Sequence, residues 1–135
     1  MQHDELIGKV QDRAHLPSRG DAERVTRSVL ETLGERIPEQ TAEHLASQLP
    51  LEIAEHLRRT ITMGGAGTGE RFGLNEFAGR VAYRGRMTEP DAVYGSRAVL
   101  EVVGEATHGT LDKVRDTLPG ELRDLIDAGS SGPLH

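Results

Sequence analysis

Apolar side chains recur at helical spacing through most of the chain. In the first segment Leu6, Ile7, Val10 and Ala14 lie three or four positions apart, which places them on one side of a helix. The next segment repeats this spacing with Ala22, Val25, Val29, Leu30 and Leu33. These segments show helical periodicity rather than the alternation of a half-buried strand, so the pattern predicts a series of amphipathic helices.

The same pattern occurs twice along the chain. Residues 4–57 recur as 75–126, with an offset that begins at 71 and falls to 70 and then to 69. Between positions 21 and 35, eight of fifteen residues are identical to those at positions 91 to 105. Each dropped residue falls where a turn is expected. A repeat of this size indicates one supersecondary unit used twice, in which neither copy buries its apolar face alone.

Helix-start signals agree with this division. Ser18 and Thr88 each stand three residues before an aspartate, a spacing that resembles a capping box. Pro50 and Pro119 interrupt the apolar pattern at equivalent places, where proline is suited to open a fourth short helix. The sequence therefore predicts eight helices and no strands. We expect an all-α fold in which two pseudo-symmetric four-helix repeats pack into one helical bundle.

The domain boundaries follow from the repeat and from local composition. We expect helical repeat 1 over residues 1–61, a Gly-rich linker over 62–73, helical repeat 2 over 74–128, and a disordered tail over 129–135. Glycine-rich segments behave as flexible connectors. Small polar residues at a chain end have little to pack against and tend to fray.

The amino-acid composition excludes several kinds of functional site. The chain has 135 residues, 3% aromatic residues and no cysteine, which excludes a disulfide framework, an iron–sulfur cluster and a cysteine nucleophile. Acidic residues near the start do not fit a secretory signal, and no uncharged stretch approaches a membrane span, so we expect a cytoplasmic protein without membrane contact. With 22 acids against 16 bases, the net charge of −6 gives no general attraction to nucleic acid.

Two candidate chemistries do not meet their requirements. Gly64 and Gly69 have the spacing of a phosphate-binding loop, but Glu70 stands where lysine is needed and no strand precedes it. Of the six histidines, none forms an HExxH pair and none recurs in the other copy. Glu52 and His56 could share a helix face, yet two ligands do not complete a metal site. We therefore predict no cofactor and no metal, and interpret the histidines as solvated surface residues.

Residues that recur in both copies suggest shared structural constraints. Gly8 and Gly79 occupy the same interior position of the first predicted helix, where glycine costs about 1 kcal/mol relative to alanine. We expect a close helix crossing there. The long helix carries an i,i+4 pair of opposite charges, Arg27 with Glu31, which recurs 70 residues later. We expect these to be exposed pairs of small effect on stability.

One basic cluster is a candidate binding surface. Arg80, Tyr83, Arg84 and Arg86 gather near the end of a predicted helix in the second copy. Three arginines beside a tyrosine could bind an RNA backbone or an acidic partner. An ordinary solvated helix end is the alternative. Because the whole chain is acidic, we expect no measurable binding to random RNA or duplex DNA at physiological salt.

Several short segments together resemble a known family. These are DEL (4–6), VLETLGER (29–36) and ASQLP (46–50) in the first copy, with NEF (75–77), AVLEVVGE (98–105) and LPGEL (118–122) in the second. They resemble the bacterial domain of unknown function 2267 family from residue 3 to about residue 127. The resemblance implies the helical fold, and it brings no established reaction, cofactor or catalytic residue.

For function, the duplicated amphipathic helices favour a non-enzymatic protein–protein interaction module, because no group of polar residues converges as a catalytic site does. The expected partner is an unidentified protein or a second copy of the chain. The alternative is a small-molecule or nucleic-acid-binding regulator that uses the groove between the repeats, with Arg80, Arg84 and Arg86 as the residues to probe. An enzyme is the third hypothesis.

Overall fold

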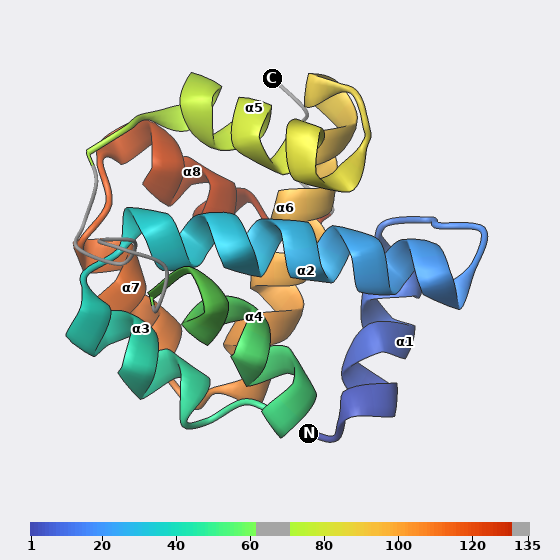
Figure 1. Ribbon diagram of the computed structural model, residues 1–135, viewed down its shortest axis with the longest axis horizontal. Helices are drawn as coiled ribbons and strands as arrows, with labels where there is room; N and C mark the ends of the chain where they lie inside the picture. Colours follow the sequence, from blue (N-terminus) through green and yellow to red (C-terminus); the bar gives the residue numbers. More distant parts are fainter. Residues whose placement is uncertain (62–70, 131–135) are drawn as a thin grey trace.

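Eight α-helices and no strand make up the described part of the chain, residues 1–61 and 71–130 of a computed structural model. The helices are α1 (His3–Arg13), α2 (Arg19–Arg36), α3 (Glu39–Ala46), α4 (Leu51–Ile61), α5 (Leu74–Gly85), α6 (Glu89–Ala106), α7 (Thr110–Asp116) and α8 (Gly120–Ala128) (Figure 1). The prediction of an all-α fold is confirmed. Residues 62–70 of the expected linker, with the glycines weighed as a phosphate loop, and residues 131–135 lie outside the described residues.

The helices begin where the start signals stand. Ser18 is the N-cap of α2, and its hydroxyl accepts a hydrogen bond of 3.1 Å from the backbone N–H three residues later. Thr88 caps α6 in the same way at 3.2 Å. Pro50 directly precedes α4, and Pro119 is the N-cap of α8. Local side-chain chemistry therefore sets these boundaries, as the sequence predicts.

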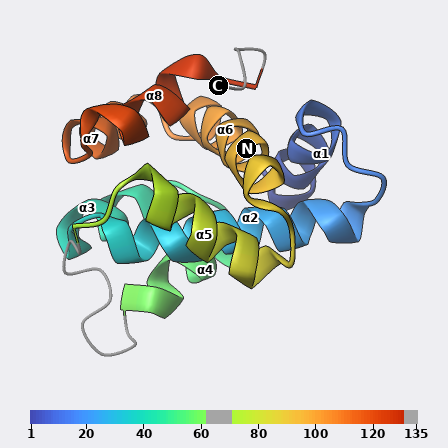
Figure 2. The ribbon, with the colours of Figure 1, turned by 90° about the horizontal axis from the view of Figure 1, so that it is seen from above.

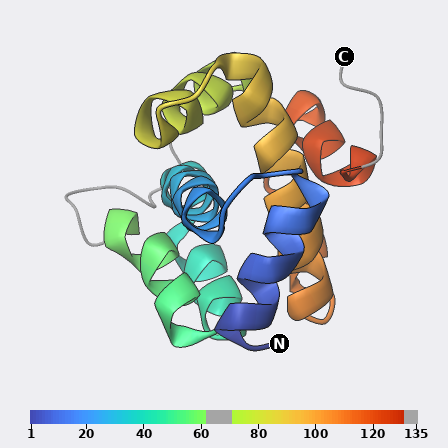
Figure 3. The same ribbon diagram turned by 90° about the vertical axis from the view of Figure 1, so that its right-hand side faces the viewer.

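The long helix α2 runs through the middle of the molecule. It contacts α1, α3, α4, α5 and α6, and Figure 3, which views it nearly end-on, shows helices around most of its circumference. On its apolar face Leu30 and Leu33 are 0% and 1% exposed. The polar residues Ser28 and Thr32 of the same helix are also fully buried. A helix covered on most sides must bury polar as well as apolar side chains.

Each first helix packs against both long helices. α1 contacts α2 and α6, and α5 contacts α6 and α2; Figure 2 shows α5 lying across α2. α2 and α6 have the same length, 18 residues, and start 70 residues apart. The two halves thus share contacts through their first helices. That the two copies superpose helix for helix stays a prediction.

The two long helices cross closely at one pair of equivalent positions. Val25 on α2 faces Gly95 on α6, which stands 70 residues later, and a Cβ atom on Gly95 would lie 2.8 Å from Cγ1 of Val25. A branched side chain in one copy thus occupies the space that glycine leaves in the other. This difference between the copies permits close packing, because two valines would collide here.

The prediction of a close helix crossing at Gly8 and Gly79 is wrong. Apart from the adjoining residues and the backbone of its own helix, no atom lies within 4 Å of a Cβ built on Gly8, and the nearest such atom to one on Gly79 is a side-chain oxygen of Glu89 at 3.3 Å. The close approach occurs instead at Gly34, where a Cβ would lie 2.6 Å from the carbonyl oxygen of Leu57 in α4. A recurring interior glycine does not by itself reveal which face of the helix meets a neighbour.

Two segments expected to be irregular are held at their inner ends. Phe72, inside the predicted linker, is 7% exposed and belongs to the hydrophobic core. Ser130, inside the predicted tail, donates from its N–H and hydroxyl to the carboxylate of Glu101 at 2.9 and 2.8 Å. Composition alone did not indicate these anchors, because their partners lie far away in the sequence. The other domain boundaries stay predictions.

Candidate functional site

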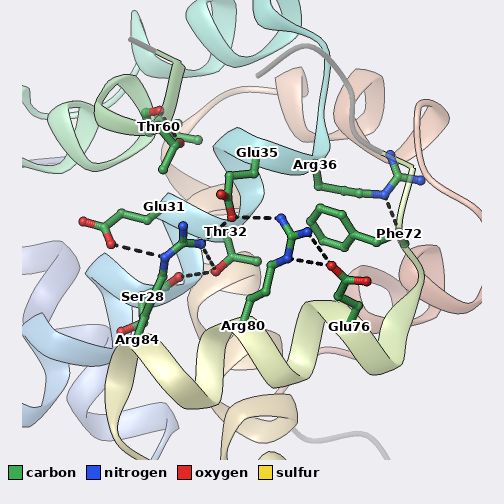
Figure 4. Close-up of polar contacts among 11 residues, drawn as sticks. Ser28, Glu31, Thr32, Glu35, Arg36, Thr60, Phe72, Glu76, Arg80 and Arg84 are labelled. Carbon is green, nitrogen blue, oxygen red and sulfur yellow. Dashed lines mark hydrogen bonds and ion pairs between the residues drawn. The ribbon is translucent and has the colours of Figure 1, made fainter. Parts of the chain in front are cut away.

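The candidate residues lie at the end of α5 and divide into two groups. Arg80 and Arg84, one helical turn apart, extend toward α2 (Figure 4). Tyr83 points away from the core and is 87% exposed. Arg86 follows the helix as its C-cap residue and is exposed. The structure therefore does not make one continuous basic surface of the four residues.

Arg84 is tied to two carboxylates and a hydroxyl of α2. Its Nη1 donates to Oε1 of Glu35 at 2.6 Å and to Oγ1 of Thr32 at 2.8 Å. Its Nε lies 3.7 Å from Oε1 of Glu31. Because these acceptors stand on successive turns of α2, the guanidinium group fastens α5 to the central helix.

Arg80 extends the same network and stacks on an aromatic ring. Its Nη1 donates to Oε1 of Glu35 at 3.2 Å, and its Nε donates to Oε2 of Glu76 at 2.9 Å. Its guanidinium carbon lies 3.9 Å from the centre of the Phe72 ring (Figure 4). A cation over an aromatic face is attracted by the ring quadrupole, so Arg80 also retains Phe72 in the core.

These contacts determine the charge that the site presents. Burial raises the pKa of Glu35, but the hydrogen bond and charge of Arg84, together with Arg80, outweigh burial and hold that pKa below its ordinary value. Glu35 therefore stays ionised at neutral pH. The positive charges of Arg80 and Arg84 are largely compensated within the protein, which weakens both as phosphate ligands.

A matching network joins α1 to α6. Nη1 of Arg13 donates to Oε1 of Glu101 at 3.0 Å, and Nη2 donates to Oε1 of Glu105 at 2.9 Å. Lys9 lies 3.4 Å from the same carboxylate of Glu105. Because of the hydrogen bonds with Arg13, the pKa of Glu105 lies below its ordinary value. These residues stand 70 or 71 positions before or after the members of the α5–α2 network.

Neither network was predicted from the sequence, although a signal was present. Basic residues recur four apart on each first helix, and acids recur four apart on each long helix. The expected pairing of Arg27 with Glu31 on one helix is wrong. Within the described residues, Glu31 pairs with Arg59 of α4 and with Arg84.

The second expected pair also departs from an exposed arrangement. Arg97 is 2% exposed, and its Nε donates to the carbonyl oxygen of Gly129 at 2.8 Å. Glu101 binds Arg13 and Ser130. Residues at equivalent positions of a repeat need not keep the same partners, because the elements that cover them differ.

Arg86 stands apart from the other arginines of the cluster. Its backbone is left-handed, with φ of 55°, and closes α5 together with a 3.0 Å hydrogen bond from the N–H of Met87 to the carbonyl of Ala82. His15 has the same conformation after α1, with φ of 53°. The guanidinium group of Arg86 forms no hydrogen bond or ion pair with any described residue. Its charge is therefore available to a ligand.

Among the hollows lined by described residues, three lie at the end of α5 and the neighbouring loop. A hollow of about 940 Å³ lies on one side of Tyr83 and is lined by Arg24, Arg84, Arg86, Met87 and Asp91 among others. A second, of about 440 Å³, lies on the other side above Glu35 and Arg80. A third, of about 260 Å³, shares Arg24, Met87 and Asp91 with the first and extends to His15 and Tyr94. The exposed ring of Tyr83 thus stands between two depressions.

The histidines of the described residues do not gather with acidic residues at one place. No group of three His, Asp or Glu side chains among them is placed to hold a metal ion. His15 stacks on the ring of Tyr94 with centroids 6.2 Å apart. Burial, reinforced by the charge of Arg59, lowers the pKa of His56, which favours its neutral form.

The helices described here include none with the length and apolar character that a membrane crossing requires.

Comparison with known proteins identifies a family. The family model described as "Uncharacterized conserved protein (DUF2267)" matches residues 3–125. No match was found among curated proteins. The match covers α1 to α7 and most of α8.

Proposed function

We propose a function from the premise that the chain belongs to the DUF2267 family: a non-enzymatic protein–protein interaction module that docks its partner at the end of α5. The family is described only as an uncharacterized conserved protein, so the support comes from the geometry of the chain. The proposed docking surface, called the Tyr83 surface below, consists of Tyr83, Arg86 and the hollows on both sides of Tyr83.

The exposed ring of Tyr83 carries the proposal. Tyr83 is 87% exposed, whereas Phe72 and Phe77 are 7% and 2% exposed. Tyr94 is half-buried, and its hydroxyl donates to the carbonyl of Arg13 at 2.9 Å. Of the four Phe and Tyr rings in the chain, that of Tyr83 therefore stands in solvent. Tyrosine is among the residues that most often dominate the energy of protein interfaces.

The surface is rigidly presented. Arg80 and Arg84, which stand three residues before and one residue after Tyr83, attach α5 to α2 through two glutamates. Binding to a rigid helix loses less conformational entropy than binding to a mobile loop. The hollows on both sides of Tyr83 offer depressions into which side chains of a partner fit.

The electrostatics favour binding over catalysis. The carboxyl groups with lowered pKa values, such as Glu35 and Glu105, are engaged by arginines of neighbouring helices. Catalytic acids and bases instead have pKa values close to the operating pH, whereas the pKa values of these two groups are shifted away from it. This arrangement supports an interaction role rather than an enzymatic one.

Small-molecule or nucleic-acid binding between the two halves is the second candidate. The 940 Å³ hollow favours it, because Arg24 from the first half and Arg86 from the second both line that hollow. Compensation of Arg80 and Arg84 by glutamates weakens the nucleic-acid form of this hypothesis.

Site-specific photo-crosslinking tests the proposal. A benzophenone amino acid at position 83 should crosslink one discrete protein in the producing cell, whereas the same group at Leu51, which is 65% exposed on α4, should not. The crosslinked protein, once purified, should bind the full chain directly. Tyr83→Ala should weaken this binding at least tenfold, and Leu51→Ala should leave it unchanged. Equal crosslinking at both positions, or crosslinking to RNA alone, would refute the proposal.

A further inference from the structure

The largest of the three hollows is unusual in its charge. Three arginines and one aspartate line it, Arg24, Arg84, Arg86 and Asp91, in a chain with 16 bases and 22 acids. Arg84 is compensated by Glu31 and Glu35. Arg24 is paired with Asp21 on one side, so most of the charge that remains for a ligand comes from Arg86.

Arg24 has one side of its guanidinium group occupied. Its Nη1 lies 3.0 Å from Oδ1 of Asp21. Its Nε is shielded from solvent and has no hydrogen-bond partner among the described residues. The edge formed by Nε and Nη2 is the edge that binds a carboxylate through two parallel hydrogen bonds. A donor that is shielded from solvent and has no acceptor costs free energy. If the side chain of Arg24 shifts enough to admit a carboxylate, the hydrogen bond to Nε would remove that cost.

Arg86 brings a second cation at some conformational cost. Glycine is the usual residue in the left-handed position that ends a helix, since a Cβ atom is strained there. Arg86 occupies this position with φ of 55°, and its side chain meets no partner among the described residues that repays the strain. His15 has the same conformation at the equivalent position, so the strain belongs to the end of the helix, and what Arg86 adds to the hollow is its uncompensated guanidinium group.

The remaining lining residues define what kind of anion fits. Met87 packs partly against the core, and Tyr83 forms the rim, so apolar contact is available beside the two cations. Asp91 also faces the hollow from the start of α6, where its N–H donates to Thr88. A chain of phosphates would meet Asp91 as well as the arginines. A single carboxylate carries less negative charge than a chain of phosphates and is therefore repelled less by Asp91.

We propose that the partner of the Tyr83 surface inserts one aspartate or glutamate side chain, flanked by an apolar residue, into this hollow between Arg24 and Arg86. This inference rests on the proposed function and deepens it by naming the chemistry of the partner segment. The apolar neighbour contacts Met87 and the ring of Tyr83, and the carboxylate pairs with the free edge of Arg24 and with Arg86.

Peptide selection tests this inference while the partner is still unidentified. Random twelve-residue peptides displayed on phage are selected on the immobilised full chain. The enriched peptides should share an acidic residue beside an apolar one. Exchange of that acid for its amide, made in a synthetic peptide, should weaken binding at least tenfold in calorimetry. Enriched peptides without a shared acid, or no enrichment, would overturn the inference.

Protein variants place the peptide in the hollow. Arg86→Gly removes the side chain and relieves the left-handed strain, so the fold should be as stable as the parent or more stable while peptide binding falls at least tenfold. Arg24→Gln should also weaken binding. Lys113→Ala on α7, an exposed residue distant in sequence from the hollow, is the matched control and should leave binding unchanged. Unchanged binding to Arg86→Gly would place the peptide elsewhere and reject the inference.

Three further outcomes separate this inference from the proposed function. If the protein crosslinked at position 83 binds Arg86→Gly as tightly as the parent, the interaction module stands and the acidic anchor fails. If a single-stranded RNA of 20 nucleotides displaces the selected peptides at physiological salt, the hollow serves nucleic acid and both proposals fail. Absence of any crosslink at position 83 rejects the proposed function itself.

Discussion

The duplicated charges around α2 and around α6 meet different surroundings. Around α2 the side chains of Glu31 and Glu35 are 10% and 16% exposed. Around α6 the equivalent Glu101 and Glu105 are 29% and 42% exposed. The helix pairs and the signs of the charges correspond, with Lys9 in the place of Arg80, so this difference does not come from the charges themselves.

Other elements account for the difference. Arg59 of α4 reaches Glu31, and the ring of Phe72 lies under Arg80, which covers the network at α2. At α6, Ser130 contributes the additional contacts to Glu101. An ion-pair network contributes more to the free energy of unfolding when solvent is excluded from it. The same duplicated side chains should therefore matter more for stability at α2 than at α6.

The sharpest test of this contrast uses two equivalent glycines. A Cβ on Gly34 would lie 2.6 Å from a backbone oxygen of α4, whereas the nearest atom to one on Gly104 is the end of the Leu111 side chain at 2.9 Å. Backbone cannot move aside as a side chain can. Gly34→Ala should lower the free energy of unfolding by about 3 kcal/mol and Gly104→Ala by about 1 kcal/mol or less. Urea denaturation measures both free energies. Equal losses would show that α2 and α6 are packed equally tightly at these two positions.

The glutamates provide the next comparison. Glu35→Gln leaves Arg80 and Arg84 half-buried with a weaker partner and should cost about 2 kcal/mol of stability. Glu105→Gln, in the more exposed network, should cost below about 1 kcal/mol. Chemical denaturation in low salt gives both values. A larger loss for Glu105→Gln would show that exposure does not govern these networks.

The pH dependence of the free energy of unfolding offers a further comparison of the two charge networks. Burial raises the pKa of Glu101, but Ser130 and Arg13 hold it below its ordinary value, and Glu105 and Glu35 also have lowered pKa values. Groups of this kind stabilise the fold above their unfolded pKa, and this stability is lost as pH falls through the folded pKa. The free energy of unfolding should decline below about pH 5.

Removal of these carboxyl groups should flatten the decline unequally. The double variant Glu101→Gln, Glu105→Gln removes two groups with lowered pKa values around α6, whereas Glu35→Gln removes one around α2. Each variant should show a shallower acid slope than the parent, and the double variant the shallowest. Slopes identical to that of the parent would contradict the assignment.

The smallest expected effect compares the two left-handed corners. His15 and Arg86 have φ of 53° and 55°, and glycine relieves such strain by about 1 kcal/mol. Arg86→Gly should therefore raise the melting temperature slightly. His15→Gly should gain less, because it also loses the stacking contact with Tyr94. A fall in melting temperature for Arg86→Gly would reveal a structural role for its side chain.

Features that depend on near neighbours in the sequence were predicted well. The caps at Ser18 and Thr88 and the helix starts after Pro50 and Pro119 follow from contacts within a few residues. The candidate site was predicted only in part. Tyr83 belonged to the cluster named as a candidate binding surface, and its ring is exposed. The partners of Arg80 and Arg84 were missed.

The missed features involve contacts between distant segments. Periodicity gives the orientation of a side chain about its own helix, but not the helix that covers it. Gly8 was expected at a crossing and Gly34 was not, although both recur in the second copy. Which glycine meets a neighbouring backbone depends on the packing of α2 against α4.

By itself the sequence determined the helical class, the helix starts at the capping residues and the duplication, since each rests on local hydrogen bonding or on residue identity. Only the tertiary structure decided that the duplicated charges join α1 to α6 and α5 to α2, and that two of the three clustered arginines are compensated. It also left Tyr83 and Arg86 in solvent. The physical reason is that charge compensation and burial depend on which helices meet, and side chains more than forty residues apart set those contacts.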